Sequence, residues 1–143
     1  MRSYLGLFAA LILAACGINE ASAQSIVTTT IPSGTATSGE VNLIPYLHVG
    51  QQNPVQIQMP SAWTTASLIF LVSNDGGDTF HELYDGNGNE YVVNAEANAL
   101  ILLDPNVFNY ISVFEIESVN YSSPPSVPVN QAATRTLAIT TTR

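Results

Sequence analysis

The sequence predicts an all-β fold, an antiparallel β-sandwich or jelly roll of about eight or nine strands, from three observations. Apolar and polar residues alternate with period two in VQIQM (55–59) and TRTLAITTT (134–142), as they do in strands with one buried face. Turn residues recur at short intervals between the apolar runs, among them Asp75-Gly76-Gly77 and Asp104-Pro105-Asn106. No window of a dozen residues shows an apolar stripe with helical spacing.

Three denser apolar runs predict central strands that are buried on both faces: ASLIFLVS (66–73), ALILLD (99–104) and YISVFEIES (110–118). The segment DPNVFNY (104–110) is compatible with a single helical turn. No internal repeat is visible, which argues against a propeller or a solenoid.

Residues 1–23 predict an export signal, with Arg2 before the apolar run 5–15, which is too short to span a bilayer. Two cleavage sites compete. Leu13-Ala14-Ala15-Cys16 has the form of a lipobox that ends in a lipidated Cys16, whereas Ala21-Ser22-Ala23 has the form of an ordinary signal-peptidase site. Either site leaves 24–143 as a single β-sandwich domain, because about 120 residues suit one domain with one core.

The charge balance limits the partners. The 143 residues carry three Lys or Arg and eleven Asp or Glu, for a net charge of −8. A negative surface repels phosphate backbones, so nucleic acid is excluded as a partner. Contact with a membrane is expected only through the signal or a lipid anchor, and the signal favours export to the periplasm, outer membrane or extracellular space.

The segment SNDGGDTF (73–80) fits the pattern S-x-D-x-G-x-T-[F/W] through Ser73, Asp75, Gly77, Thr79 and Phe80. This pattern resembles the Asp-box, a short hairpin found in sialidases and in many unrelated β-proteins. A carboxylate at the start of such a turn can accept hydrogen bonds from backbone N–H groups two or three residues on. We expect a structural turn without catalysis, after which Phe80 faces the core.

The segment DGNGNEYVVNAE (85–96) places Asp85, Asn87, Asn89 and Glu96 at positions 1, 3, 5 and 12 of a calcium-loop pattern. Position 6 is Glu90, where the loop needs glycine, and the flanks FHELY and YVV are typical of strands. We expect a hairpin tip, and a looser calcium site on Asp85, Asn87 and Asn89 remains an alternative. No other cofactor is expected.

Catalytic patterns are few, and we expect no enzymatic activity. His48 and His81 are the two histidines, and no nucleophile motif accompanies them. Asp78, Glu82 and Asp85 could supply a carboxylate pair for glycoside hydrolysis. Hairpin tips, however, rarely offer the enclosed cleft that raises the pKa of one carboxyl group above that of the other.

Aromatic residues suggest a surface for glycans. Trp63, the only tryptophan, is expected to anchor the core, and its alternative role is a stacking platform for a sugar ring. The other candidate ligand residues lie on or near the two acidic turns: Asp78, Tyr84, Asp85, Asn87, Asn89 and Tyr91.

The segments 57–93, 99–108 and 128–143 resemble small β-sandwich proteins of tailed phages and prophages, and TTTIPSGTATSGEVNL (28–43) resembles the first strands of that family. The resemblance implies a non-catalytic virion surface protein, such as a decoration, spike or fibre component, that forms homo-oligomers, packs against other virion proteins or contacts host glycans. The signal segment departs from that family. An exported, lipid-anchored carbohydrate-binding or envelope-binding module is therefore the alternative.

Overall fold

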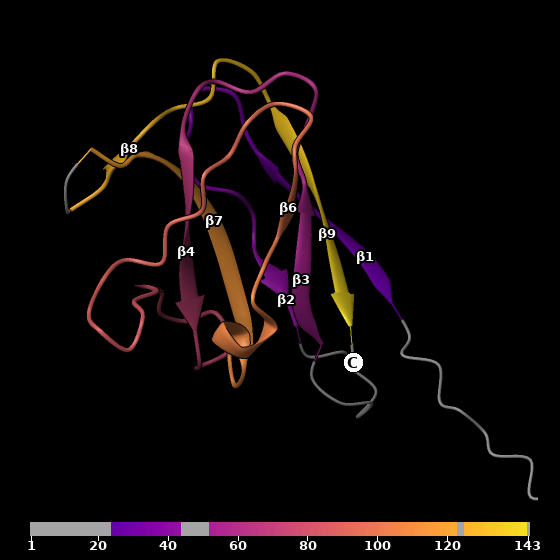
Figure 1. The fold of residues 1–143 in the computed structure, drawn as a ribbon, viewed down its shortest axis with the longest axis vertical. Helices are drawn as coiled ribbons and strands as arrows, with labels where there is room; N and C mark the ends of the chain where they lie inside the picture. The colour runs from indigo at the N-terminus through magenta and orange to yellow at the C-terminus, as the bar shows by residue number, and fades with distance from the viewer. Residues whose placement is uncertain (1–23, 44–51, 123–124, 143) are drawn as a thin grey trace, which may run out of the picture.

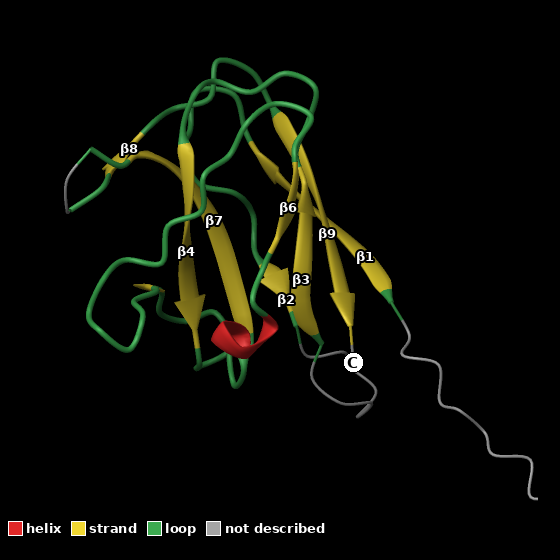
Figure 2. Ribbon diagram, in the orientation of Figure 1, coloured by secondary structure: helices red, strands yellow, loops and turns green. Residues whose placement is uncertain are grey.

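The computed structural model describes residues 24–43, 52–122 and 125–142, and it confirms the predicted antiparallel β-sandwich. Two layers of strands face each other in Figure 1, and the only helical element among the described residues is one short turn, red in Figure 2. The expected export signal, with Cys16, and His48 lie outside the described residues.

The first layer, sheet A, has the strand order β1-β9-β3-β6. Its strands are β1 (Ser25–Ile31), β9 (Arg135–Thr142), β3 (Asn53–Gln58) and β6 (Leu100–Leu102). The two chain ends of the domain meet here, since all seven residues of β1 pair with β9. The period-two alternation of 134–142 reappears in the burial of β9, where Leu137 and Ile139 are fully buried and Thr136 is exposed.

The second layer, sheet B, has the order β2-β7-β4-β5, and β8 also pairs with β7. Its strands are β2 (Val41–Asn42), β7 (Val113–Asn120), β4 (Ser67–Ser73), β5 (His81–Glu82) and β8 (Val127–Pro128). The central position predicted for 66–73 and 110–118 is confirmed, because β4 and β7 pair along seven residues, but burial on both faces was wrong, since Leu71 and Glu115 are half-buried on the outer face. Short segments cover the other edge of β7, which leaves no long edge there for a foreign strand.

The third predicted central strand was wrong. Residues 100–102 form β6, an edge strand that pairs only with β3. Ile101 packs against the core, whereas Leu100 and Leu102 are 55% and 78% exposed. Apolar density in the sequence does not distinguish a strand buried on both faces from an exposed apolar edge.

Of three shorter expectations, the structure confirms one and contradicts two. The helical turn expected in 104–110 is a 3-10 turn, η1 (Pro105–Phe108), capped by the Asp104 carboxylate, which accepts a hydrogen bond from the Asn106 N–H. The flank YVV is not a strand, since Val93 makes only an isolated bridge to Leu68. Phe80 is half-buried and lies outside the core cluster, contrary to the expectation that it faces the core.

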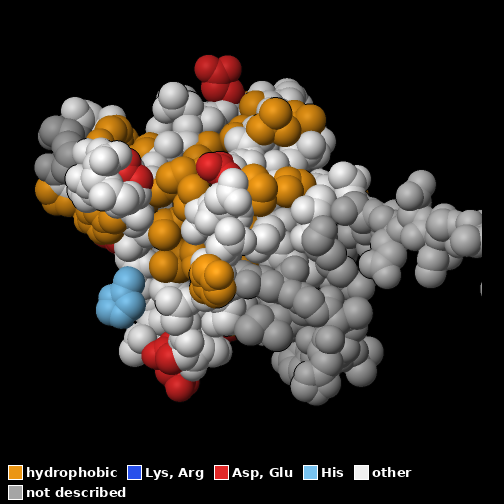
Figure 3. All heavy atoms as spheres, turned by 60° about the horizontal axis from the view of Figure 1, so that its bottom comes forward, with side chains coloured by type: hydrophobic (Ala, Val, Ile, Leu, Met, Phe, Trp, Pro, Cys, Tyr) orange, Lys and Arg blue, Asp and Glu red, His pale blue; other side chains and the backbone are white. Residues whose placement is uncertain are grey.

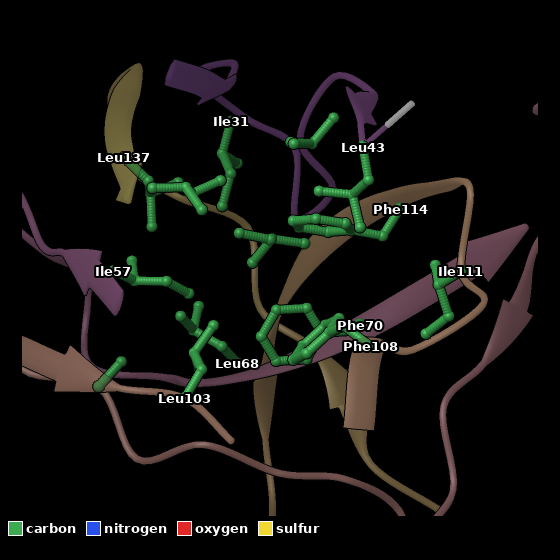
Figure 4. Close-up of a cluster of buried hydrophobic side chains, with 14 of the residues drawn as sticks. Ile31, Leu43, Ile57, Leu68, Phe70, Leu103, Phe108, Ile111, Phe114 and Leu137 are labelled. Atoms are coloured by element: carbon green, nitrogen blue, oxygen red, sulfur yellow. The ribbon is translucent and has the colours of Figure 1, made fainter. Parts of the chain in front are cut away.

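The core lies between the sheets and centres on three phenylalanines (Figure 4). Phe70 of β4 meets Phe108 of η1 with ring centroids 5.0 Å apart and an interplanar angle of 78°. The ring centroids of Phe114, on β7, and of Tyr91 lie 5.7 and 5.8 Å from the ring centroid of Phe70. Edge-to-face pairs of this kind stabilise the fold beyond the effect of the apolar area that they bury. The turn η1 therefore brings Phe108 into contact with both long strands of sheet B.

Buried polar side chains connect the loops at one end of the sandwich. Gln131 is fully buried, its side-chain oxygen accepts a hydrogen bond from the Thr64 N–H at 3.0 Å, and its backbone exchanges hydrogen bonds with Gly34 and Thr35. Ser118 is also fully buried and donates to the carbonyl groups of Ala36 and Val129. These contacts join segments far apart in sequence without a disulfide.

Candidate functional site

The turn after β4 is closed by its own side chains. The Ser73 hydroxyl donates to the Asp75 carboxylate at 2.6 Å and accepts the Gly77 N–H at 2.9 Å. The Thr79 N–H and hydroxyl both donate to Asp75. The backbone donor lies four residues after the carboxylate, rather than two or three, and Gly76 and Gly77 have φ of 84° and 103°, which an L side chain rarely adopts.

Hydrogen bonds from Ser73 and Thr79 hold the pKa of Asp75 well below its ordinary value of 3.8. A carboxylate that is kept ionised and saturated by its own turn has little capacity left for a substrate. The five residues of the pattern therefore act on the shape of the loop, with Phe80 half-buried behind it.

The tip 85–89 has a similar arrangement. The Asp85 carboxylate accepts the N–H groups of Asn87 at 2.8 Å and Asn89 at 2.9 Å, and an isolated bridge joins Tyr84 to Glu90. These bonds, first those from Asn89, lower the pKa of Asp85. The Glu90 carboxylate is buried and accepts a hydrogen bond from the Ser126 N–H at 3.2 Å. Glu90 thereby ties the tip to the segment that precedes β8.

Three residues of the calcium pattern, Asp85, Asn87 and Asn89, lie together at the tip. Across residues 24–43, 52–122 and 125–142, no group of three or more His, Cys, Asp or Glu side chains could hold a metal ion. Asn87 and Asn89 are exposed beside Asp85, and Glu96, the twelfth residue of the pattern, lines a groove with Asn94 and Tyr121.

The carboxylates considered for hydrolysis are all exposed. Asp78 and Glu82 lie in water-accessible positions, and Glu82 accepts a hydrogen bond from the Tyr84 hydroxyl at 2.9 Å. The lowered pKa of Asp85 is opposite to what a general acid requires. His81 is exposed on β5.

The three aromatic residues considered for glycan binding do not form one exposed surface. Trp63 is half-buried against the core and its indole N–H donates to the Ala66 carbonyl at 3.0 Å. Tyr91 packs between Phe70 and Phe108, and burial raises the pKa of its hydroxyl. Tyr84 is 48% exposed, with its hydroxyl held by Glu82, which raises the pKa of that tyrosine.

The structure shows a groove that sequence reasoning missed, which we call the polar groove. It lies where β4 begins and β7 ends, next to β8 in Figure 1, and it has a volume of about 320 Å³. Its lining residues come from three segments: Thr65, Ala66 and Ser67; Asn94, Ala95 and Glu96; and Val119, Asn120 and Tyr121. Apart from Glu96, which belongs to the calcium pattern, no motif marks these residues, because β4–β7 pairing and the bridge from Leu68 to Val93 bring them together.

The two outer faces of the sandwich differ in charge. Strand alternation and register place only uncharged side chains on the outer face of sheet A: Ile26, Thr28, Thr30, Gln56, Gln58, Leu100, Leu102, Thr136, Ala138 and Thr140. On the outer face of sheet B, Glu82 and Glu115 flank Leu71 in one cross-strand row, and Glu117 is the next outward residue of β7. We call these surfaces the uncharged face and the acidic face.

Two glutamates of the acidic face, Glu115 and Glu117, have raised pKa values. Burial first, and then Glu40 and Glu117, raise the pKa of Glu115 above its ordinary value of 4.5. Burial also raises the pKa of Glu117, with Glu82 adding to the effect and the hydrogen bond from Thr37 opposing it. In both residues the ionised form destabilises the folded chain.

A pH dependence of stability follows from these shifts. A raised folded-state pKa costs stability above that pKa and costs nothing below the ordinary value of 4.5, so we expect the melting temperature to rise as pH falls from 7 towards 4.5. Asp75 has the opposite sign, and its contribution is lost as pH falls below 3.8. Calorimetry between pH 3 and 8 measures the first change in full and the beginning of the second.

The variants Glu115→Gln and Glu117→Gln should raise the melting temperature at pH 7 and flatten the rise on acidification. Asp75→Asn should instead lower the melting temperature at pH 7 and flatten the fall below pH 3.8. Glutamine variants that keep the wild-type slope between pH 7 and 4.5 would contradict the assignment.

Comparisons with protein-family models, curated proteins and solved structures give no match. None of the described residues lies in a helix that is both long and apolar enough to cross a membrane. Fold and surfaces together define the protein as an antiparallel β-sandwich with one uncharged face, one acidic face and a polar groove.

Proposed function

We propose that this protein is a non-catalytic structural protein of the virion-surface type, a decoration, spike or fibre component, that self-assembles through the uncharged face. The observation that carries the proposal is the separation of charge between the two sheets. The chain has a net charge of −8, and yet the outer face of sheet A presents no charged side chain among its described residues.

A second copy of this chain fits that face best. Two copies that pack their uncharged faces together desolvate no carboxylate, and their acidic faces stay in water. Contact through the acidic face would bring Glu82, Glu115 and Glu117 towards the same residues of another copy. Like-charge repulsion disfavours that arrangement.

The uncharged face also offers apolar area. Ile26 on one edge strand is 70% exposed, and Leu100 and Leu102 on the other are 55% and 78% exposed. Between the two edges lie threonine and alanine methyl groups on β1 and β9 and the amide side chains of Gln56 and Gln58 on β3. Figure 3 draws a different face of the molecule, on which hydrophobic side chains gather in the middle among several Asp and Glu side chains and no Lys or Arg is visible. The uncharged face therefore combines exposed apolar side chains at its two edges with uncharged polar side chains between them.

The virion assignment is supported by the resemblance of 57–93, 99–108 and 128–143 to phage β-sandwich proteins, together with this surface. Mass spectrometry of purified particles from the native host tests it, because a virion component should be present in many copies per particle. Absence from particles, together with a lipid-modified Cys16 in the envelope fraction, would instead establish the exported module.

Self-assembly has a direct test in Leu102→Glu. We expect the purified protein to be oligomeric by light scattering, and the variant to raise the subunit dissociation constant at least tenfold, because it places a carboxylate within the contact. His81→Glu adds the same charge at an exposed position of β5 and should leave the oligomer unchanged. A monomeric wild-type protein at high concentration, or equal effects of the two variants, would count against the proposal.

A carbohydrate-binding module is the second candidate, and the polar groove is the observation that favours it. The two functions are compatible, since the groove lies on sheet B and the assembly face on sheet A.

A further inference from the structure

The polar side chains of the groove make no hydrogen bond to other residues in the part of the chain that the structure describes. Thr65, Ser67, Asn94, Glu96, Asn120 and Tyr121 line it, and none of their side chains bonds to another described residue. The other loops differ, because the carboxylates of Asp75, Asp85 and Asp104 are satisfied by their own turns. The groove therefore concentrates donors and acceptors that no other described residue satisfies and that a ligand can use.

We propose that the polar groove is a binding site for a neutral saccharide. Asn94 and Asn120 each supply a donor and an acceptor, and the hydroxyl groups of Thr65 and Ser67 supply both as well. Sugar hydroxyl groups are likewise both donors and acceptors, so they match this mixture. The chain's charge of −8 and the carboxylate of Glu96 disfavour an anionic ligand.

The apolar part of the lining suits a sugar ring. Ala66, Ala95 and Val119 lie buried beneath the groove, and of these only Ala66 and Ala95, each 8% exposed, offer a small apolar area to the C–H face of a ring. Tyr121 is 40% exposed at the groove and offers an aromatic ring for stacking. The volume of about 320 Å³ lies at the lower end of small-ligand sites, about 300–1,000 Å³.

The three lining segments are held in place without a ligand. Ser67 and Val119 are register partners in the β4–β7 pair, and Leu68 and Val93 exchange two backbone hydrogen bonds of 2.8 Å. These contacts fix the position of Asn94 relative to the start of β4. A preformed site loses less conformational entropy on binding than a site that the ligand has to order.

The saccharide site does not depend on self-assembly. If copies associate through the uncharged face of sheet A, the grooves on sheet B remain open, and several sites on one particle bind a repeating glycan with increased avidity. Leu102→Glu should therefore keep the affinity of the single groove.

Trp63 provides a reporter for a binding experiment. It is the only tryptophan of the chain, and its indole N–H donates to the carbonyl of Ala66, which lines the groove. We would titrate the full protein with glucose, galactose, mannose, rhamnose, N-acetylglucosamine and the trimer of N-acetylglucosamine, and follow tryptophan fluorescence and calorimetric heat. At least one saccharide should bind saturably in the millimolar range or tighter.

Tyr121→Ala and Asn94→Ala should each weaken that binding at least tenfold. Tyr84→Ala removes another exposed tyrosine, 48% exposed and outside the groove, and should leave it unchanged. No saturable binding by any of the six saccharides, or equal affinity of wild type, Tyr121→Ala and Asn94→Ala, would overturn the proposal. An oligomeric protein without saccharide binding would refute this site and keep the assembly proposal, and a monomer that binds would do the reverse.

Discussion

Phe70→Ala is expected to destabilise the domain by about 3–5 kcal/mol, the usual cost of removing a buried phenylalanine ring. Phe70 is fully buried and contacts the rings of Tyr91, Phe108 and Phe114. Its loss leaves a cavity between β4, β7 and η1 that rigid strands fill only in part. Because single domains are stable by about 5–15 kcal/mol, this one change removes a large share of the total.

Urea unfolding of the purified protein, followed by tryptophan fluorescence, measures this effect. Tyr84→Ala is the matched control, because it also removes an aromatic ring but from a side chain that is 48% exposed, and it should cost less than about 1 kcal/mol. Similar losses for the two variants would show that the aromatic cluster does not dominate the core.

Gln131→Ala is expected to destabilise the domain by about 2–3 kcal/mol, although the residue is polar and lies in a loop between β8 and β9. Its side chain is fully buried, accepts the Thr64 N–H at 3.0 Å and donates to the Thr64 carbonyl at 3.4 Å. The substitution leaves that N–H group without a partner and opens a cavity, and each change costs free energy.

Asn130→Ala is a suitable control, since Asn130 is exposed and the neighbouring backbone is the same. It should change stability by less than about 0.5 kcal/mol. Gln131→Glu adds a second test, because it keeps the size of the side chain but replaces the donor by a buried charge, and it should be at least as harmful as Gln131→Ala. A neutral outcome for both Gln131 variants would contradict its role as a connection between loops.

Much of the fold could be predicted from the sequence because local rules decide it. Alternation in 134–142 predicted β9, and the apolar runs predicted β4 and β7. The error at 99–104 has a physical reason. Leu100, Ile101 and Leu102 look equally apolar in the sequence, but only the position of β6 at the sheet edge leaves two of them exposed.

The candidate sites were harder to predict because they depend on contacts between distant segments. Trp63 and Tyr91 are aromatic residues in a polar context, and yet packing against the core takes most of their surface. Asn94, Asn120 and Tyr121 belong to no motif, and only the pairing of β4 with β7 and the Leu68–Val93 bridge bring them into one groove.

The sequence by itself determined the all-β class, the turn chemistry of Asp75 and Asp85, and the strong negative charge, because these follow from composition, periodicity and neighbouring residues. Tertiary structure alone decided where that charge lies. The carboxylates of Glu82, Glu115 and Glu117 share one face because β5, β4 and β7 pair in a particular register. Long-range pairing likewise created the uncharged face and the polar groove, on which the proposed assembly and binding depend.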